Sequence, residues 1–355
     1  MMDRSIGYDP SSFSMDKLKV GIIGFGRIGA EHAGWINASK NTCAIATADA
    51  TPQRREKGQS AGLRVYERME DLLKDREINA ILVSTPTSMH FDHARAALNA
   101  GKHVMVEKPM TMDYPTSKSL ADQARSTGKT LSVFHCRRWD IDYLTVRALI
   151  ASGMLGKIIS IESRLGQWSS CVGPAAREYH PNWRNERSFG GGGLYDWGSH
   201  FIDQIWQLML PTKPRRVFAQ LRGNVWSSDC DDFARVCIDF DNGAAALVEI
   251  NTTTTRPLPR WHIDGTLGSA DSPFSLKFDT QEWAKLVFSP ADGSEPCAIA
   301  KPQAGLNETQ IWEAFARACR GEGEPAVSVE SVLTTMKLLD AARQSSTEGI
   351  AVSIS

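Results

Sequence analysis

The feature that most constrains this chain is a set of glycines that follows a short apolar run near its start. Residues 19–29 read Lys-Val-Gly-Ile-Ile-Gly-Phe-Gly-Arg-Ile-Gly, so a predicted strand leads into Gly-x-Gly-x-x-Gly and then into a predicted helix. Gly24 permits a tight turn, Gly26 lets the backbone approach a pyrophosphate, and Gly29 lets the helix pack closely on the sheet. This arrangement is typical of a turn that binds a dinucleotide.

A chain with 28 glycines could contain the Gly-x-Gly-x-x-Gly pattern by chance. The surroundings of the turn, however, support its interpretation as a dinucleotide-binding turn. The helix dipole and the first backbone N–H groups, those of Phe25, Arg27 and Ile28, would face the phosphates. A second apolar run, residues 43–48, ends in Asp49 about 20 residues past the turn, where an acid holds the ribose hydroxyls of a dinucleotide. The alternative for Asp49 is a loop cap or a solvated acid.

The same acid bears on which dinucleotide binds. The charge of Asp49 would repel a 2′-phosphate and accept a hydrogen bond from a 2′-hydroxyl, which favours NAD. Arg54 and Arg55 follow closely and could bind that phosphate, so NADP is the alternative.

The order of strand and helix signals predicts an α/β fold in two domains. Up to residue 136 apolar strands alternate with helices, which indicates a Rossmann domain over 18–136 with a doubly wound parallel sheet. Strand signals then cluster, with a hairpin at Asp241-Asn242-Gly243, so 137–355 is predicted to be an α+β domain with an open, mostly antiparallel sheet. Its two C-terminal helices are expected to pack back on the first domain. Residues 1–17 are polar and predicted to form a flexible tail.

Composition excludes several classes of partner. Lys plus Arg total 40 against 41 for Asp plus Glu, without blocks of like charge, so neither nucleic acid nor an anionic membrane is an expected partner. The seven cysteines are scattered without a C-x-x-C pair, which favours reduced thiols and no metal site. No apolar run approaches the roughly 20 residues that span a bilayer, and we expect a soluble, cytoplasmic protein. One face of the open sheet must be covered by helices or by a second subunit, and the face left exposed predicts a homodimer or homotetramer.

Two predicted strands deliver polar residues to one edge of the parallel sheet. Strand 80–83 runs into Ser84-Thr85-Pro86, with His90 beginning the next helix, and strand 103–106 runs into Glu107-Lys108-Pro109. Ligands bind at this carboxyl edge in open α/β sheets. We therefore expect the side chains at this edge to contact the cofactor, and these are Ser84, Thr85, Pro86, His90, Glu107 and Lys108. Lys108 could also donate to a substrate oxygen, and its alternative role is that of a surface lysine at a strand end.

A glycine-rich stretch precedes the second set of candidate residues. Gly190 to Gly193 lead into Asp196, His200 and Asp203, which share one stripe of a predicted helix. A carboxylate one turn before a histidine can orient the ring and steady its charged form, which makes His200 a candidate general base. The alternative is a solvated polar stripe. Trp168 and Trp183 could stack on a sugar ring, and Arg164, Arg184 and Arg187 could contact substrate, although core packing and salt bridges explain such residues equally well.

Four motifs together resemble the Gfo/Idh/MocA family, the group of glucose–fructose oxidoreductase and inositol dehydrogenase. They are Gly-Phe-Gly-Arg-Ile-Gly (24–29), Ala-Gly-Lys-His-Val-Met-Val-Glu-Lys-Pro (100–109), the glycine-rich Asp-x-x-x-His stretch (190–200) and Gly-Thr-x-Gly-Ser (265–269). Arg-Arg-Trp-Asp (137–140) followed by Asp-Tyr-Leu-Thr (142–145) is similar to the branch with scyllo-inositol dehydrogenases. Two positions depart from the family pattern, Thr87 and Phe189, where asparagine and serine are common.

The resemblance implies reversible oxidation of a secondary hydroxyl on a sugar or cyclitol with a nicotinamide cofactor. It implies that Lys108, Asp196 and His200 form the catalytic set, with Asp203 as a further candidate. Arg138 and Trp183 are expected to join the catalytic set in binding substrate. The family also contains NAD-dependent glycosidases that use transient oxidation, and regulators that bind a dinucleotide without turnover. Both remain alternatives to the dehydrogenase.

Overall fold

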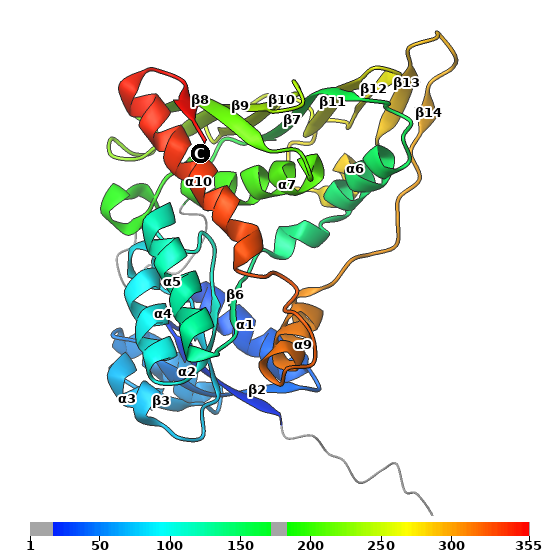
Figure 1. The fold of residues 1–355 in the computed structure, drawn as a ribbon. Coiled ribbons are helices and arrows are strands. Elements are labelled where there is room, and N and C mark those ends of the chain that lie inside the picture. The colour runs from blue at the N-terminus through cyan, green and yellow to red at the C-terminus, as the bar shows by residue number, and fades with distance from the viewer. Residues whose placement is uncertain (1–16, 172–182, 355) are drawn as a thin grey trace, which may run out of the picture.

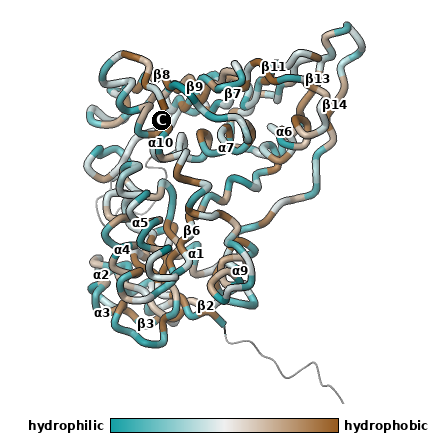
Figure 2. Tube along the Cα trace, in the orientation of Figure 1, coloured by the Kyte–Doolittle hydropathy of each residue, from teal (hydrophilic) through white to brown (hydrophobic). Residues whose placement is uncertain are grey.

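Two β-sheets, one parallel and one mixed, organise the chain. A computed structural model describes residues 17–171 and 183–354, and the tail predicted at the N-terminus lies outside the described residues apart from Lys17. The parallel sheet and the mixed sheet lie at opposite ends of the molecule, with helices between them (Figure 1). Figure 2 shows hydrophobic residues along the strands of both sheets and hydrophilic residues in the outer loops. No helix in the described part of the chain is long and apolar enough to cross a membrane.

The first sheet confirms the predicted doubly wound arrangement. Its order is β3-β2-β1-β4-β5-β6, and every pair of neighbours is parallel. The strands are β1 (Leu18–Ile23), β2 (Thr42–Ala48), β3 (Arg64–Tyr66), β4 (Ala80–Val83), β5 (His103–Val106) and β6 (Leu131–Val133). All residues of β4 are fully buried, as expected for a strand covered on both faces. The order reverses between β1 and β4, which makes the carboxyl ends of these strands a binding crevice.

Helices from both ends of the chain cover this sheet. One face packs against α3 (Met69–Lys74), α4 (His90–Asn99) and α5 (Tyr114–Thr127). The other face packs against α1 (Arg27–Ala38) and α9 (Glu308–Cys319), and α2 (Pro52–Ser60) lies beside β2 and β3. Trp312 and Phe315 of α9 are fully buried in this second layer. A helix encoded far along the chain thus completes the nucleotide-binding half.

The second sheet has nine strands in the order β14-β13-β12-β11-β7-β10-β9-β8-β15. Only β7 and β10 are parallel neighbours, so the sheet is mostly antiparallel, as predicted. The strands are β7 (Ile158–Gly166), β8 (Pro214–Arg222), β9 (Phe233–Phe240), β10 (Ala245–Asn251), β11 (Trp261–Gly265), β12 (Gly268–Asp271), β13 (Val287–Pro290), β14 (Cys297–Ala298) and β15 (Val352–Ser353). The predicted hairpin turn joins β9 to β10, and Gly243 adopts a φ of +85° there.

The inner face of the second sheet is covered by helices that lie toward the first domain (Figure 1). They are α6 (Ile141–Ala151), α7 (Ser199–Met209), α8 (Thr280–Trp283) and α10 (Glu330–Glu348). α10 contacts β8 and α7 and also reaches α5 of the parallel-sheet layer. The outer face of the sheet carries both ionic and apolar side chains, among them the Arg235–Glu249 pair and the exposed Phe218.

Substitution of Gly29 by alanine tests how tightly the nucleotide turn is packed. A Cβ at Gly29 would lie 2.1 Å from the Gly24 carbonyl oxygen, so the turn must deform. We expect Gly29→Ala to lower the free energy of unfolding by about 1–3 kcal/mol in a denaturant titration and to weaken dinucleotide binding.

Gly34 is the matched control on the same helix. A Cβ there meets nothing within 4 Å, and Gly34→Ala should raise the free energy of unfolding by up to about 1 kcal/mol. Equal stability of the two variants would contradict the proposed packing of the turn.

Candidate active site

The glycine turn has the geometry that a pyrophosphate site requires. Gly24 adopts a φ of +89°, which favours glycine, and Gly26 is the N-cap of α1 with no side chain capping the helix. The first amides of α1 therefore point toward the crevice between β1 and β4. The Phe25 amide differs from its predicted role, because it donates to the Asp49 carboxylate at 2.7 Å and the Phe25 side chain is buried.

Asp49 holds this turn together from the end of β2. Besides accepting from Phe25, its second carboxylate oxygen accepts from the Thr51 amide at 2.9 Å. Arg54 lies beside it, with Nη1 3.8 Å from Oδ2, and its guanidinium carbon lies 3.7 Å from the position of a Cβ on Gly26. The acid and the arginine predicted to select the dinucleotide are thus adjacent at the turn.

These residues fit a nicotinamide dinucleotide. An uncapped helix N-terminus, a glycine over which a ligand can approach and an acid at the end of the next strand lie together at the point where the strand order reverses. The backbone N–H groups of α1 would hold the pyrophosphate, and Asp49 and Arg54 would lie beside the adenosine ribose.

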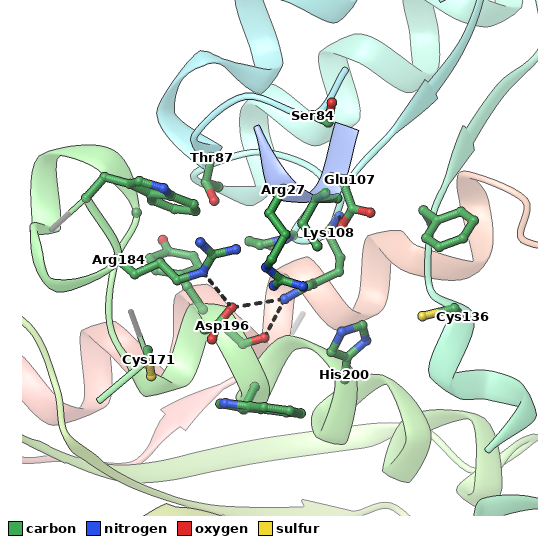
Figure 3. A pocket seen from close by; sticks show the side chains of 18 of the residues that line it. Arg27, Ser84, Thr87, Glu107, Lys108, Cys136, Cys171, Arg184, Asp196 and His200 are labelled. Atoms are coloured by element: carbon green, nitrogen blue, oxygen red, sulfur yellow. Dashed lines mark hydrogen bonds and ion pairs between the residues drawn. The ribbon is translucent and has the colours of Figure 1, made fainter. Parts of the chain in front are cut away.

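A cavity of about 530 Å³ extends from this turn to the helices beneath the second sheet. Figure 3 shows side chains from both domains converging on it. The predicted residues that line it are Arg27, Ile28, Ser84, Thr85, His90, Glu107, Lys108, Trp183, Asp196 and His200. The predicted residues outside its wall are Gly24, Phe25, Gly26, Gly29, Asp49, Arg54, Pro86 and Arg138. Six of these eight residues, all except Pro86 and Arg138, belong to the nucleotide turn or lie next to it.

Lys108 and Asp196 meet across this cavity. Lys108 Nζ donates to the Asp196 backbone oxygen at 2.7 Å and to its Oδ1 at 3.2 Å, and Arg184 Nε lies 3.5 Å from the same Oδ1 (Figure 3). Burial raises the pKa of Asp196, but the charges of Lys108 and Arg184 outweigh it, so that the pKa lies below its usual value. Asp196 is therefore a carboxylate that joins two cations.

The local helix differs from the continuous helix predicted around Asp196. Residues Leu194–Gly198 form a π-helical turn before α7 begins at Ser199. Such turns are rare and are often found at functional sites. The predicted pairing of Asp196 with His200 is not observed, since no hydrogen bond joins them among the described residues. The partners of Asp196 are the cations instead.

His200 is a buried, neutral base. Its side chain is 5% exposed, and its Nδ1 has no hydrogen-bond partner among the described residues. Its ring lies edge-on to His135 with centroids 5.6 Å apart. Burial lowers its pKa well below the usual value, and the charges of Lys108 and Arg137 act in the same direction. A neutral imidazole beside a lysine can accept a proton from a hydroxyl group.

The candidates Arg138 and Asp203 form a buried ion pair behind the cavity. Arg138 Nε and Nη2 each lie 2.7 Å from an Asp203 oxygen, and Thr335 donates to Asp203 at 3.0 Å. Arg138 also donates to the Ser331 hydroxyl at 2.9 Å. This pair joins the segment after β6 to α7 and α10, and it does not line the cavity. Asp203 thus supports the helix that carries His200.

Arg137, rather than its neighbour Arg138, lines the cavity. Its guanidinium carbon lies 4.9 Å from the Trp197 ring centroid and 4.2 Å from that of Phe278, and its Nη1 lies 3.1 Å from Asp140. Two adjacent arginines are equivalent at the level of sequence pattern, so only the fold distinguishes Arg137 from Arg138. Arg184, for which the sequence predicts a substrate contact or a salt bridge, lies in the wall as a partner of Asp196.

Two cysteines, Cys136 and Cys171, also lie in the cavity wall, and the sequence pattern predicts no role for either of them. Burial raises the pKa of the Cys136 thiol to about 12 and that of Cys171 well above its usual value. Both thiols are therefore protonated, and they contribute weakly polar surface rather than a nucleophile.

The parallel sheet with its nucleotide turn defines a dinucleotide-binding Rossmann domain, and a polar cavity lies beside it. Residues 18–135 match the family described as "Oxidoreductase family, NAD-binding Rossmann fold", and residues 143–271 match "GFO/IDH/MocA C-terminal domain". The chain belongs to the Gfo/Idh/MocA family.

Proteins that are similar to this chain over much of its length support the family assignment. The chain is 28% identical to scyllo-inositol 2-dehydrogenase (NADP(+)) IolW of Bacillus subtilis, over 94% of this chain and 95% of that protein. It is 34% identical to the uncharacterized oxidoreductase YdgJ of Escherichia coli, over 60% of each chain. The solved structure of an NAD-binding protein from Listeria innocua superposes with a TM-score of 0.84 at 29% identity, covering 95% of this chain and 97% of that one.

The protonation state of His200 can be tested by NMR titration of the protein without cofactor. We expect the His200 ring to remain neutral well below pH 6.5, because burial and neighbouring cations disfavour its charged form. Removal of the nearby cation in Lys108→Met should raise its pKa. The remote surface substitution Lys118→Met should leave it unchanged, and a His200 that titrates at or above pH 6.5 in the wild type would contradict this electrostatic assignment.

Proposed function

We propose that the protein is an NAD(P)-dependent dehydrogenase that transfers hydride between a nicotinamide cofactor and a secondary hydroxyl or ketone of a sugar or cyclitol. The observation that carries this proposal is the convergence of Lys108, Asp196 and His200 in one cavity next to the nucleotide turn. Acceptance or donation of hydride is the chemistry that the bound nicotinamide supplies.

Lys108 stabilises the charge that develops on the reacting oxygen. Its ammonium group has three N–H donors, of which two are directed at the backbone oxygen and carboxylate of Asp196. The third donor is available for the substrate oxygen. A fixed ammonium group in a site with little water lowers the cost of forming an alkoxide.

His200 completes the acid–base chemistry of the reaction. During oxidation it takes the hydroxyl proton, and during reduction it returns one. Its neutral state suits the first of these roles. Asp196 keeps Lys108 in place and can accept a hydrogen bond from a neighbouring substrate hydroxyl.

The rest of the cavity wall suits a substrate ring that carries several hydroxyl groups. Gln167 and Ser169 offer hydrogen-bond donors and acceptors, and Trp183 and Trp197 offer flat apolar faces. Arg184 lies over the face of Trp183, with 4.3 Å between its guanidinium carbon and the ring centroid. The similarity to an inositol dehydrogenase supports a sugar or cyclitol as the substrate class.

NAD is the proposed cofactor, with NADP as the alternative. Hydrogen bonds from the Phe25 and Thr51 amides fix the Asp49 side chain at the turn, where its negative charge would oppose a 2′-phosphate. Arg54 lies beside Asp49, and its positive charge would favour the 2′-phosphate of NADP. The similar inositol dehydrogenase is named for NADP(+). Activity with both cofactors must therefore be compared.

The first test is a nicotinamide absorbance screen of cyclitols, aldoses and sugar acids with each cofactor. We expect one substrate group to reduce the cofactor, and Lys108→Ala and His200→Ala to lower kcat by about 10²- to 10⁴-fold. Lys118→Ala, which removes an exposed lysine on α5, is the matched control and should retain full activity.

Assays with glycosides and calorimetry with the dinucleotide separate the competing functions. Net hydrolysis of glycosides without net cofactor reduction would move the assignment to an NAD-dependent glycosidase. Dinucleotide binding in calorimetry without turnover of any polyol or glycoside would favour a non-catalytic regulator.

The outer face of the second sheet supports the further proposal of a homodimer or homotetramer. Phe218, Cys237 and Leu247 form a row across three adjacent strands. The ion pairs Arg216–Asp239 and Arg235–Glu249 flank this row on either side. An apolar centre with a charged rim is typical of a self-association surface.

Light scattering at micromolar concentration tests this assembly. We expect the mass of a dimer or tetramer, and Phe218→Glu should weaken association by about tenfold or more because it places a charge in the apolar row. A monomeric wild type would refute the assembly without affecting the catalytic proposal.

A further inference from the structure

A chain of hydrogen bonds links the C-terminal helix α9 to the edge of the cofactor cavity. Trp312 Nε1 lies 3.0 Å from His32 Nδ1, and His32 Nε2 lies 2.8 Å from Glu107 Oε1. The other oxygen of Glu107 accepts from the Lys108 amide at 3.1 Å. Trp312 and His32 are 280 residues apart in the sequence. The chain therefore connects α9, α1 and the end of β5.

The chemistry of these groups sets the direction of every hydrogen bond. An indole nitrogen can only donate, so His32 Nδ1 must be an unprotonated acceptor. A neutral imidazole then carries its hydrogen on Nε2 and donates it to Glu107. Glu107 accepts at both oxygens and is therefore a carboxylate. Burial raises the pKa of Glu107, but the hydrogen bond from His32 and the charge of Lys108 act in the opposite direction, and the pKa lies below its usual value.

Close packing and the hydrogen bond from Trp312 together favour one orientation of the His32 ring. The side chains of His32 and Trp312 are fully buried. Phe134, Trp35 and Trp312 lie edge-on to the imidazole, with ring centroids 4.3, 4.8 and 5.7 Å away. A flipped ring would place a carbon where the Trp312 N–H donates, and this buried donor would lose its partner.

We propose that Trp312 and His32 are positioning residues for the cofactor: they hold Glu107 as a carboxylate in one orientation at the cavity wall. The Glu107 side chain is 14% exposed there, next to Lys108, and its remaining lone pairs are available to hydroxyl donors of the nicotinamide ribose. This role rests on the proposed function only in assuming that a nicotinamide dinucleotide fills the cavity. It makes α9 part of the cofactor site.

The hydrogen-bond directions can be read directly in the cofactor-free protein. In ¹⁵N-histidine NMR at neutral pH, we expect Nε2 of His32 to carry the hydrogen and Nδ1 to be the unprotonated acceptor. Trp312→Phe keeps an aromatic ring but removes the donor to Nδ1. His32 should then also populate the Nδ1–H tautomer, because Nδ1 is left without a donor.

Calorimetry of dinucleotide binding gives the functional readout. Trp312→Phe should weaken binding about threefold to tenfold, because Glu107 is no longer held in one orientation. His32→Gln retains a donor that can reach Glu107, whereas His32→Leu offers none. We expect the glutamine variant to bind more tightly than the leucine variant, which a purely structural role for His32 would not require.

Trp283→Phe is the matched control for the indole substitution. Trp283 is also buried, with 4% of its surface exposed, but it lies on α8 and outside the cavity wall. This variant should leave the His32 tautomer and the Kd unchanged. Thermal unfolding of each variant identifies any that fails to fold.

The outcomes separate this inference from the proposed function. A wild-type His32 that is charged or Nδ1-protonated at neutral pH would overturn the inference, as would unchanged Kd values in Trp312→Phe and His32→Leu. A wild type that binds no dinucleotide would instead refute the proposed function. Binding without polyol turnover would refute the dehydrogenase and leave the positioning role supported by the Kd values.

Discussion

The contact between Lys108 and Asp196 is the interaction on which the site depends. Lys108 follows β5 of the parallel sheet, and Asp196 lies in the π-helical turn before α7, which packs under the mixed sheet. Removing two charges from water usually offsets much of their attraction, so this pair is not primarily a source of stability. Its value is geometric, because it fixes one ammonium group from the nucleotide half against the wall of the other half.

The charges around this pair also determine what each neighbour can do. Lys108 and Arg184 keep Asp196 ionised, and the same lysine helps to keep His200 neutral. A cavity with a fixed cation, a fixed anion and an uncharged base contains the parts that proton transfer from a hydroxyl group requires. Behind it, the buried Arg138–Asp203 pair anchors α7 to α10 and so fixes the position of His200.

Local sequence patterns predicted those features that depend on a few neighbouring residues. The turn at Gly24, the buried strand β4 and the hairpin at Gly243 follow from spacing and backbone preference. The pairing of Asp196 with Lys108 and Arg184, instead of His200, depends on contacts between distant segments and on a π turn that helical periodicity does not predict. The choice of Arg137 over Arg138 at the cavity depends on which way one short segment turns, and adjacent identical residues carry no signal for it.

The return of α9 to the first sheet has a consequence for how such a protein can evolve. The nucleotide-binding half is not one continuous stretch of chain, because Trp312 and Phe315 fill a layer that residues 18–136 cannot close alone. A recombination event at residue 136 would separate the sheet from part of its own core and expose apolar surface. Exchange of cofactor domains between relatives would therefore have to carry α9 along, and the two halves of the gene should diverge together.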